Sequence, residues 1–171
     1  MPKLLILRHA KSAKNTDAAT DFERPLTGRG RRASRRVAEW IRTHELAPHL
    51  TLSSPAVRCR ETLQSVVGTD GAGGPEPVFE SEIYGADAAS LAERLRQIDD
   101  AVEIVMLCGH NPGLEELGLW LSADPLPRAD NGKLLTTGAI IHLDLTATWA
   151  DLGPDSCRLV ELVRPRSARR D

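Results

Sequence analysis

The sequence predicts an α/β fold, a three-layer α/β/α sandwich with a mainly parallel central sheet and an antiparallel C-terminal strand. Short, largely apolar runs typical of buried strands recur along the chain, and segments with helical spacing of apolar residues lie between most of them. The last two apolar runs have no helical segment between them. They are therefore expected to pair as an antiparallel hairpin.

The expected strands are nearly continuous apolar runs, which is the pattern of parallel strands that are buried on both faces. They cover residues 3–7, 50–53, 102–108, 139–145 and 158–163, with a weaker candidate at 78–83.

Helix-start signals precede the amphipathic segments. Thr27 can cap a helix, and Ser54 followed by Pro55 has the pattern of a cap and a first helical residue. Asp87 precedes a third amphipathic segment, and a fourth helix is expected to begin near Pro112. Strands and helices therefore alternate through most of the chain.

Length and charge set the broad class of protein. The 171 residues suit one domain, expected over residues 1–165, followed by a basic tail at 166–171. The 22 Lys and Arg residues nearly balance the 24 Asp and Glu residues, which argues against nucleic acid or a membrane as partner. No apolar run has the length of a signal-peptide core or a membrane span, so a cytoplasmic monomer is expected.

The three cysteines, Cys59, Cys108 and Cys157, are widely spaced and include no Cys-x-x-Cys pair. This pattern indicates neither a disulfide framework nor a thiolate metal site, and we expect all three to be buried. None is followed at the sixth position by the arginine that a Cys-x5-Arg phosphatase requires.

Two of the expected strands end on a histidine. Arg8 and His9 follow the first apolar run, and His110 follows the run at 102–108. Because the carboxyl ends of parallel strands meet at one edge of a sheet, these side chains are expected to lie together. A lone histidine in this position is more often a turn residue, but two of them with an arginine favour a site for an anion.

A third segment is expected at the same edge. Arg58 falls in the first turn of the helix after Ser54, where free backbone N–H groups and the helix dipole already favour an anion. Arginines bind phosphate in a bidentate manner, and a neutral imidazole can act as the nucleophile in phosphoryl transfer. Gly132-Lys133 lacks the other residues of a P-loop, and no His-x-His or His-Asp pair offers a metallophosphatase site.

Four motifs in order now resemble the histidine phosphatases of the phosphoglycerate mutase-like superfamily. Residues 7–10 are similar to its Arg-His-Gly signature, with alanine for glycine, and residues 53–62 and 109–113 to its second arginine and second histidine segments. Arg-His-Ala-Lys-Ser at 8–12, followed by the segment 21–30, resembles more narrowly the SixA-type phosphohistidine phosphatases. The resemblance covers nearly the whole chain.

The resemblance implies that His9 is transiently phosphorylated, that Arg8, Arg58 and His110 bind the phosphoryl oxygens with help from Asn15, and that no metal or cofactor is used. For Asp21 and Arg24, a structural ion pair and a substrate contact remain equal alternatives.

Larger members of the superfamily carry a glutamate, four residues before a glycine, that protonates the leaving group. Counting back from Gly85 gives Ser81, with Glu82 beside it. Glu82 is either the catalytic acid after a one-residue shift or a solvated carboxylate.

The expected activity is a metal-independent phosphatase acting on phosphohistidine in a protein. A small-molecule phosphomonoesterase and a non-catalytic phosphate-binding module are the alternatives, and the partner is a phosphorylated protein or a small phosphorylated molecule.

Overall fold

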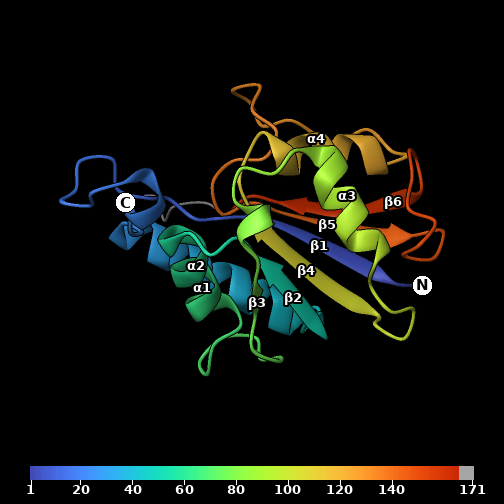
Figure 1. The fold of residues 1–171 in the computed structure, drawn as a ribbon, viewed down its shortest axis with the longest axis horizontal. Helices are drawn as coiled ribbons and strands as arrows, with labels where there is room; N and C mark the ends of the chain where they lie inside the picture. Colours follow the sequence, from blue (N-terminus) through green and yellow to red (C-terminus); the bar gives the residue numbers. More distant parts are fainter. Residues whose placement is uncertain (166–171) are drawn as a thin grey trace.

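The computed structural model describes residues 1–165; the expected basic tail at 166–171 lies outside the described residues. A six-stranded sheet in the order β3-β2-β4-β1-β5-β6 forms the centre of the molecule, with helices on both faces (Figure 1). The strands are β1 (Lys3–Arg8), β2 (Leu50–Ser53), β3 (Val78–Phe79), β4 (Ile104–Gly109), β5 (Ile140–Leu145) and β6 (Cys157–Val163). The α-helices are α1 (Gly28–Thr43), α2 (Val57–Val66), α3 (Ala88–Arg96) and α4 (Gly113–Leu121), and two short 3-10 helices are η1 (Asp21–Glu23) and η2 (Ser81–Ile83).

The sheet confirms the predicted fold class. Strands β1 to β4 run parallel, β5 runs antiparallel to β1, and β6 returns antiparallel to β5. The predicted hairpin is therefore present. Its first strand, β5, runs opposite to the parallel strands, and its second strand, β6, runs in their direction.

The weak strand predicted at 78–83 is wrong over most of its length. Only Val78 and Phe79 pair with β2, and the chain then turns into η2. The amide of Glu80 still donates to the carbonyl of Ser53, but Tyr84 already bonds back to Ser81. The apolar residue Ile83 is thus buried from a helical turn and not from a strand.

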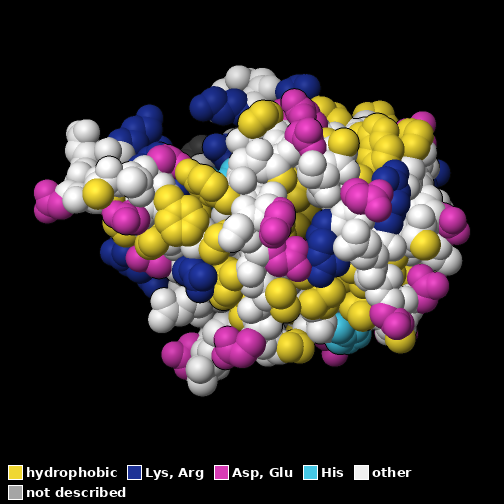
Figure 2. Space-filling model, viewed as in Figure 1, with side chains coloured by type: hydrophobic (Ala, Val, Ile, Leu, Met, Phe, Trp, Pro, Cys, Tyr) yellow, Lys and Arg dark blue, Asp and Glu magenta, His cyan; other side chains and the backbone are white. Residues whose placement is uncertain are grey.

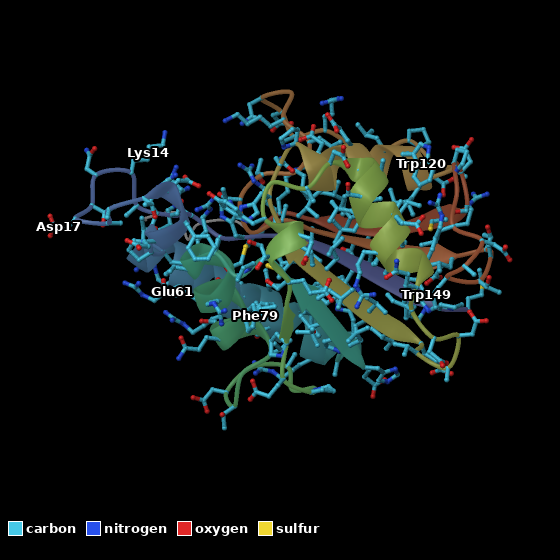
Figure 3. The ribbon with its side chains drawn as sticks, in the orientation of Figure 1. Lys14, Asp17, Glu61, Phe79, Trp120 and Trp149 are labelled. Carbon is cyan, nitrogen blue, oxygen red and sulfur yellow. The ribbon has the colours of Figure 1, made fainter. Side chains whose placement is uncertain are left out.

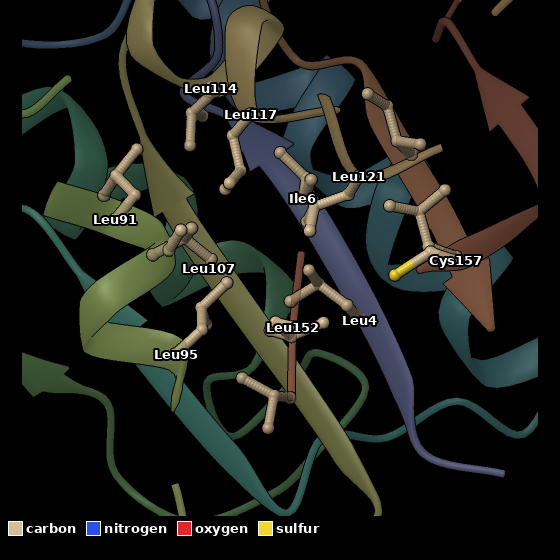
Figure 4. Packing of buried hydrophobic residues seen from close by; sticks show 14 of the residues in the cluster. Leu4, Ile6, Leu91, Leu95, Leu107, Leu114, Leu117, Leu121, Leu152 and Cys157 are labelled. Atoms are coloured by element: carbon tan, nitrogen blue, oxygen red, sulfur yellow. The ribbon is translucent and has the colours of Figure 1, made fainter. Parts of the chain in front are cut away.

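Alternate side chains of β1 enter two separate hydrophobic clusters, as the period of a strand requires. Leu4 and Ile6 pack in the cluster under α3 and α4, which Figure 4 shows from close by. Leu5 and Leu7 pack in the cluster under α1 and α2 on the other face. Because all four are fully buried, β1 is held between both helical layers.

The helix starts predicted at Thr27, Asp87 and Pro112 agree with the structure, and the one predicted after Ser54 differs. The hydroxyl of Thr27 accepts from the amide of Gly30 at 3.0 Å, which confirms it as the cap of α1. Helix α2 begins at Val57, two residues later than predicted, because Ser54 uses its hydroxyl to hold a short turn to the amide of Ala56. Among the described residues, no helix is long and apolar enough to cross a membrane.

Candidate active site

The register of two neighbouring strands places the histidines side by side. Arg8 of β1 lies opposite Gly109 of β4, so His9 and His110 each occupy the next position along the chain. The amide of His9 donates to the carbonyl of Gly109 at 3.2 Å, and the two imidazole centroids are 5.2 Å apart. Strand pairing alone therefore brings these distant residues together.

A pocket of about 420 Å³ opens at this carboxyl edge of the sheet, and Arg8, His9, Arg58 and His110 all line it. In Figure 2, Lys and Arg side chains gather around the notch at the upper left, beyond the carboxyl ends of β1 and β4. The structure thus brings four of the predicted site residues to one pocket.

The hydrogen bonds of His9 fix its tautomer. Its Nδ1 lies 2.8 Å from the carbonyl oxygen of Ala10, and since a carbonyl only accepts, Nδ1 carries the proton. Nε2 therefore keeps its lone pair. Burial is the main cause that lowers the pKa of His9 to about 3, and the neighbouring His110, Arg58 and Arg8 lower it further. The imidazole is neutral at physiological pH, as a nucleophile must be.

The segment that carries His9 is fixed to helix α2. Thr62 accepts a hydrogen bond from the amide of Ala10 at 3.0 Å and donates one to the carbonyl of Arg58 at 2.6 Å. One buried hydroxyl therefore ties the histidine segment to the turn that carries the arginine.

His110 is held from both ring nitrogens. Arg58 donates from Nη2 to its Nδ1 at 3.2 Å, so Nε2 carries the proton and donates to the hydroxyl of Ser54 at 2.8 Å. The sulfur of Cys59 lies 3.6 Å from the same Nε2. All three cysteines are buried, as predicted.

Asp21 is the carboxylate that faces Arg58. Its carbonyl and one carboxylate oxygen accept from the two Nη groups of Arg58 at 2.8 and 3.0 Å. Tyr84 donates its hydroxyl to the same carboxylate at 2.7 Å, and Arg24 donates to the other oxygen at 2.9 Å. The bond from Tyr84, followed by those from Arg24 and Arg58, holds the pKa of Asp21 far below its ordinary value. Asp21 is thus ionised and forms the structural ion pair considered from the sequence.

Arg8 reaches the pocket from the end of β1. Its Nη1 donates to the carbonyl of Leu135 at 2.9 Å, and the side-chain amide of Asn111 donates to the same oxygen at 2.8 Å. The loop before β5 therefore sets the position of Arg8.

Two predicted site residues lie elsewhere. Glu82 is exposed on η2 and lines a separate hollow with Glu80, Glu93 and Arg94. Asn15 is exposed in the loop after β1, next to Lys14, and is not among the residues that line the pocket. The spacing in the sequence gives the position of each residue along the chain. It does not give the direction of a side chain in a loop or short turn, which decides whether that side chain reaches the pocket.

The pocket also contains residues that sequence reasoning did not assign to it. Lys11 and Ser12 belong to the Arg-His-Ala-Lys-Ser motif, so that motif was an available signal. The remaining lining residues come from loops without periodicity, and the sequence offers no local signal for them: Lys14, Lys133, Thr136 and Thr137.

Two aromatic residues, Tyr84 and Trp120, lie in different parts of the molecule. Trp120 packs against the larger hydrophobic cluster, on the side of the molecule away from Lys14 (Figure 3). Tyr84 is 37% exposed, and its ring lies edge-on to His110 with centroids 5.4 Å apart. Its hydroxyl is used by Asp21, which explains why it remains at the surface.

The chemistry of the pocket is that of phosphoryl transfer. A neutral imidazole with a free Nε2, two guanidinium groups and a second imidazole surround one space, and cations stabilise the charge on the equatorial oxygens of a transferred phosphoryl group. Fold and site together define an α/β protein built to react with a phosphorylated anion.

Comparison with known proteins gives the family. The profile of the histidine phosphatase superfamily (branch 1) matches residues 4–81. An uncharacterised protein of Mycobacterium tuberculosis is 30% identical over 164 residues, which cover 94% of this chain and 100% of that protein. The phosphohistidine phosphatase SixA of Escherichia coli is 38% identical over 64 residues, or 37% of this chain and 38% of that protein.

Solved structures agree. A candidate phosphohistidine phosphatase SixA from Nakamurella multipartitia is 27% identical with a TM-score of 0.81, over 97% of both chains. One from Agrobacterium tumefaciens is also 27% identical, with a TM-score of 0.79 over 96% of this chain and 99% of that one. The chain belongs to the histidine phosphatase superfamily and is a phosphatase of that class.

Proposed function

We propose that this phosphatase removes the phosphoryl group from phosphohistidine in a protein, through a phosphorylated His9 and without a metal ion. The observation that carries this proposal is the neutral His9, with Nε2 unprotonated, in a cationic pocket. The similarity to proteins named phosphohistidine phosphatase supports the choice of substrate.

In the first step, Nε2 of His9 attacks phosphorus, and the bond from phosphorus to the substrate nitrogen breaks. Arg8 and Arg58 bind the phosphoryl oxygens, and Arg58 still has N–H groups that Asp21 and His110 do not use. His110 binds a phosphoryl oxygen by turning its Nε2–H group from the hydroxyl of Ser54 to the substrate. In the second step, water attacks phosphorus, the bond to Nε2 breaks and inorganic phosphate leaves. His9 regains its lone pair, because Nδ1 keeps its proton on the carbonyl of Ala10 throughout.

The absence of a positioned acid favours phosphohistidine over an alkyl ester. None of the described residues that line the pocket is Asp or Glu, and the nearby Asp21 is held ionised by three donors. An alkoxide is strongly basic and needs a positioned acid to leave, whereas an imidazole that has taken a proton from solvent leaves as a neutral ring. The pocket therefore suits a substrate with a good leaving group.

The test compares three substrates in EDTA: a phosphohistidine protein, an aryl phosphate and a sugar monophosphate. We expect turnover of the first two and at least about a hundredfold lower kcat/KM for the sugar phosphate, the size of contribution that general acid catalysis makes. Rapid quenching with alkali should trap phosphate on wild-type enzyme and none on His9→Ala.

Two outcomes would overturn parts of the proposal. Equal turnover of the sugar phosphate would make the protein an ordinary phosphomonoesterase, and activity that EDTA removes would make it metal-dependent. Phosphate binding without turnover of any substrate would instead indicate a binding module.

A further inference from the structure

Lysine is rare in this chain and concentrated at the pocket. The four lysines are Lys3, Lys11, Lys14 and Lys133, and all but Lys3 line the pocket. Lys3 lies at the start of β1, where its ammonium group is 2.8 Å from the carboxylate of Asp144. Within residues 1–165, no ion pair joins the three pocket lysines to an acid. The chain has a net charge of −2, so this positive charge is a local feature.

Arg24 braces the segment that carries two of these lysines. Its Nε donates to the carbonyl of Ala13 at 2.8 Å and its Nη2 to the hydroxyl of Ser12 at 2.9 Å. Its remaining Nη1 is paired with Asp21. Because Arg24 is fully engaged within the protein, Lys11 and Lys14 are the uncommitted cations on this side of the pocket.

The backbone at Lys11 is pressed against the start of α1. The amide and hydroxyl of Thr27 both donate to the carbonyl of Lys11, at 2.9 and 3.2 Å. A Cβ atom on Gly30 would lie 2.3 Å from that carbonyl oxygen, so only glycine permits this approach. The position from which Lys11 extends is therefore fixed before any ligand binds.

Lys133 comes from a different segment of the chain, a loop that is fastened beside Arg8. Its carbonyl accepts from the amide of Ala129 at 2.8 Å, and two residues later the carbonyl of Leu135 accepts from both Arg8 and Asn111. The loop that positions Arg8 thus also sets the base of Lys133.

These cations exceed what one phosphoryl group needs. A phosphoryl group carries roughly −1.5 to −2 charges at pH 7. Three arginines line the pocket, Arg8, Arg24 and Arg58, and Asp21 neutralises one of their three charges through its ion pairs with Arg24 and Arg58. The two remaining charges already balance the phosphoryl group. The pocket volume of about 420 Å³ is that of a site for a whole small ligand or a side chain with its neighbours. Three further unpaired ammonium groups are therefore available to a second anion.

We propose that Lys11, Lys14 and Lys133 form a subsite that binds a second anionic group of the substrate, a phosphate or a carboxylate, beside the phosphoryl group at His9. This inference rests on the proposed function in one respect, namely that the phosphoryl group to be transferred binds beside His9. The second anion comes either from acidic residues that flank a phosphohistidine or from another phosphate on a small molecule, and the chemistry of recognition is the same for both.

Binding is tested without turnover, by calorimetry with methylphosphonate and methylenebisphosphonate at low salt. We expect wild type to bind the bisphosphonate at least about tenfold more tightly, since unscreened ammonium groups attract the added charge. The triple variant Lys11→Gln, Lys14→Gln, Lys133→Gln should lose that preference. The control variant Arg32→Gln, Arg35→Gln, Arg42→Gln, which also removes three positive charges, from the exposed surface of α1, should keep it.

Two calorimetric results would overturn the subsite: equal affinity of wild type for both ligands, or an equal loss for both ligands in the triple variant. Because neither readout needs catalysis, a protein that binds the bisphosphonate selectively but hydrolyses nothing would refute the proposed function and leave the subsite standing.

The source of the anion is decided by kcat/KM for two matched pairs of substrates. The first pair is a phosphohistidine peptide flanked by Glu or by Gln, and the second is a sugar bisphosphate and a sugar monophosphate. A drop of about tenfold or more in the triple variant for the Glu-flanked peptide assigns the second anion to a protein, and such a drop for the bisphosphate assigns it to a small molecule. A triple variant that shows neither drop contradicts the proposal.

Discussion

Two hollows of similar size lie on this protein, and their charges are opposite. The hollow between η2 and α3 is the larger, about 660 Å³, and has Glu80, Glu82, Glu93 and Arg94 on its walls. Glu80 and Arg94 form a bidentate ion pair there, with contacts of 2.9 to 3.0 Å. The smaller pocket is lined by six cations, and four of them, Arg8, Lys11, Lys14 and Lys133, form no ion pair with an acid among the described residues. The larger hollow is therefore not the one that we propose as the active site; we chose the smaller pocket for its unpaired cations beside His9.

The largest effect is expected from the nucleophile. His9→Ala should reduce turnover of an aryl phosphate by at least about 10⁴-fold, because no other described group that lines the pocket offers an unprotonated imidazole nitrogen of this kind. Only 7% of the surface of His9 is accessible, so circular dichroism must show that the variant is folded. A folded variant with near wild-type turnover would mean that the nucleophile lies elsewhere.

The second largest effect is expected from a comparison of two arginine variants, one in each hollow. Arg58→Ala should lower kcat/KM by about a hundred- to a thousandfold, since it removes one preorganised donor to the transition state. Arg94→Ala removes the same side chain from the acidic hollow and should leave kcat/KM within about threefold, because Arg94 pairs with Glu80 and not with substrate. Similar losses in both variants would contradict the assignment of the pocket.

The depressed pKa of His9 predicts a stability effect. The folded state keeps His9 neutral down to about pH 3, whereas the unfolded chain takes up a proton at its ordinary pKa near 6.5. Protons therefore favour the unfolded state as the pH falls. Between pH 7 and 4.5, wild type should lose roughly 2–3 kcal/mol more unfolding free energy than His9→Asn. Urea unfolding at the two pH values measures this difference, and parallel losses would show that His9 titrates normally.

The smallest effect is expected at Glu82. Glu82→Gln should change turnover of aryl phosphate and phosphohistidine by less than about twofold, because Glu82 faces the acidic hollow and not the cationic pocket. Arg58→Ala, the variant in the cationic pocket, serves as the comparison, because it should show a large loss in the same assays. A sugar-phosphate activity that collapses in Glu82→Gln would make Glu82 the general acid after all.

The sequence by itself determined the fold class, and it predicted that Arg8, His9, Arg58 and His110 lie together at one edge of the sheet, as they do. Apolar runs and caps are local signals, and the two strand-end histidines follow from them once β1 and β4 pair in register. Arg58 could be placed because the first turn of a helix after a strand always lies at that edge of the sheet.

Tertiary structure alone decided the outer part of the site. Glu82 and Asn15 do not line the pocket, whereas Lys133 does and the ring of Tyr84 lies against His110. Short turns without periodicity set the directions of these side chains. The charge of Asp21 was likewise not readable from the chain, since its partners Arg24, Arg58 and Tyr84 come from three separate segments. Helices and strands follow from the spacing of apolar residues and from capping residues, which can be read from the sequence. Loop direction and charge balance depend on contacts between residues far apart in the chain.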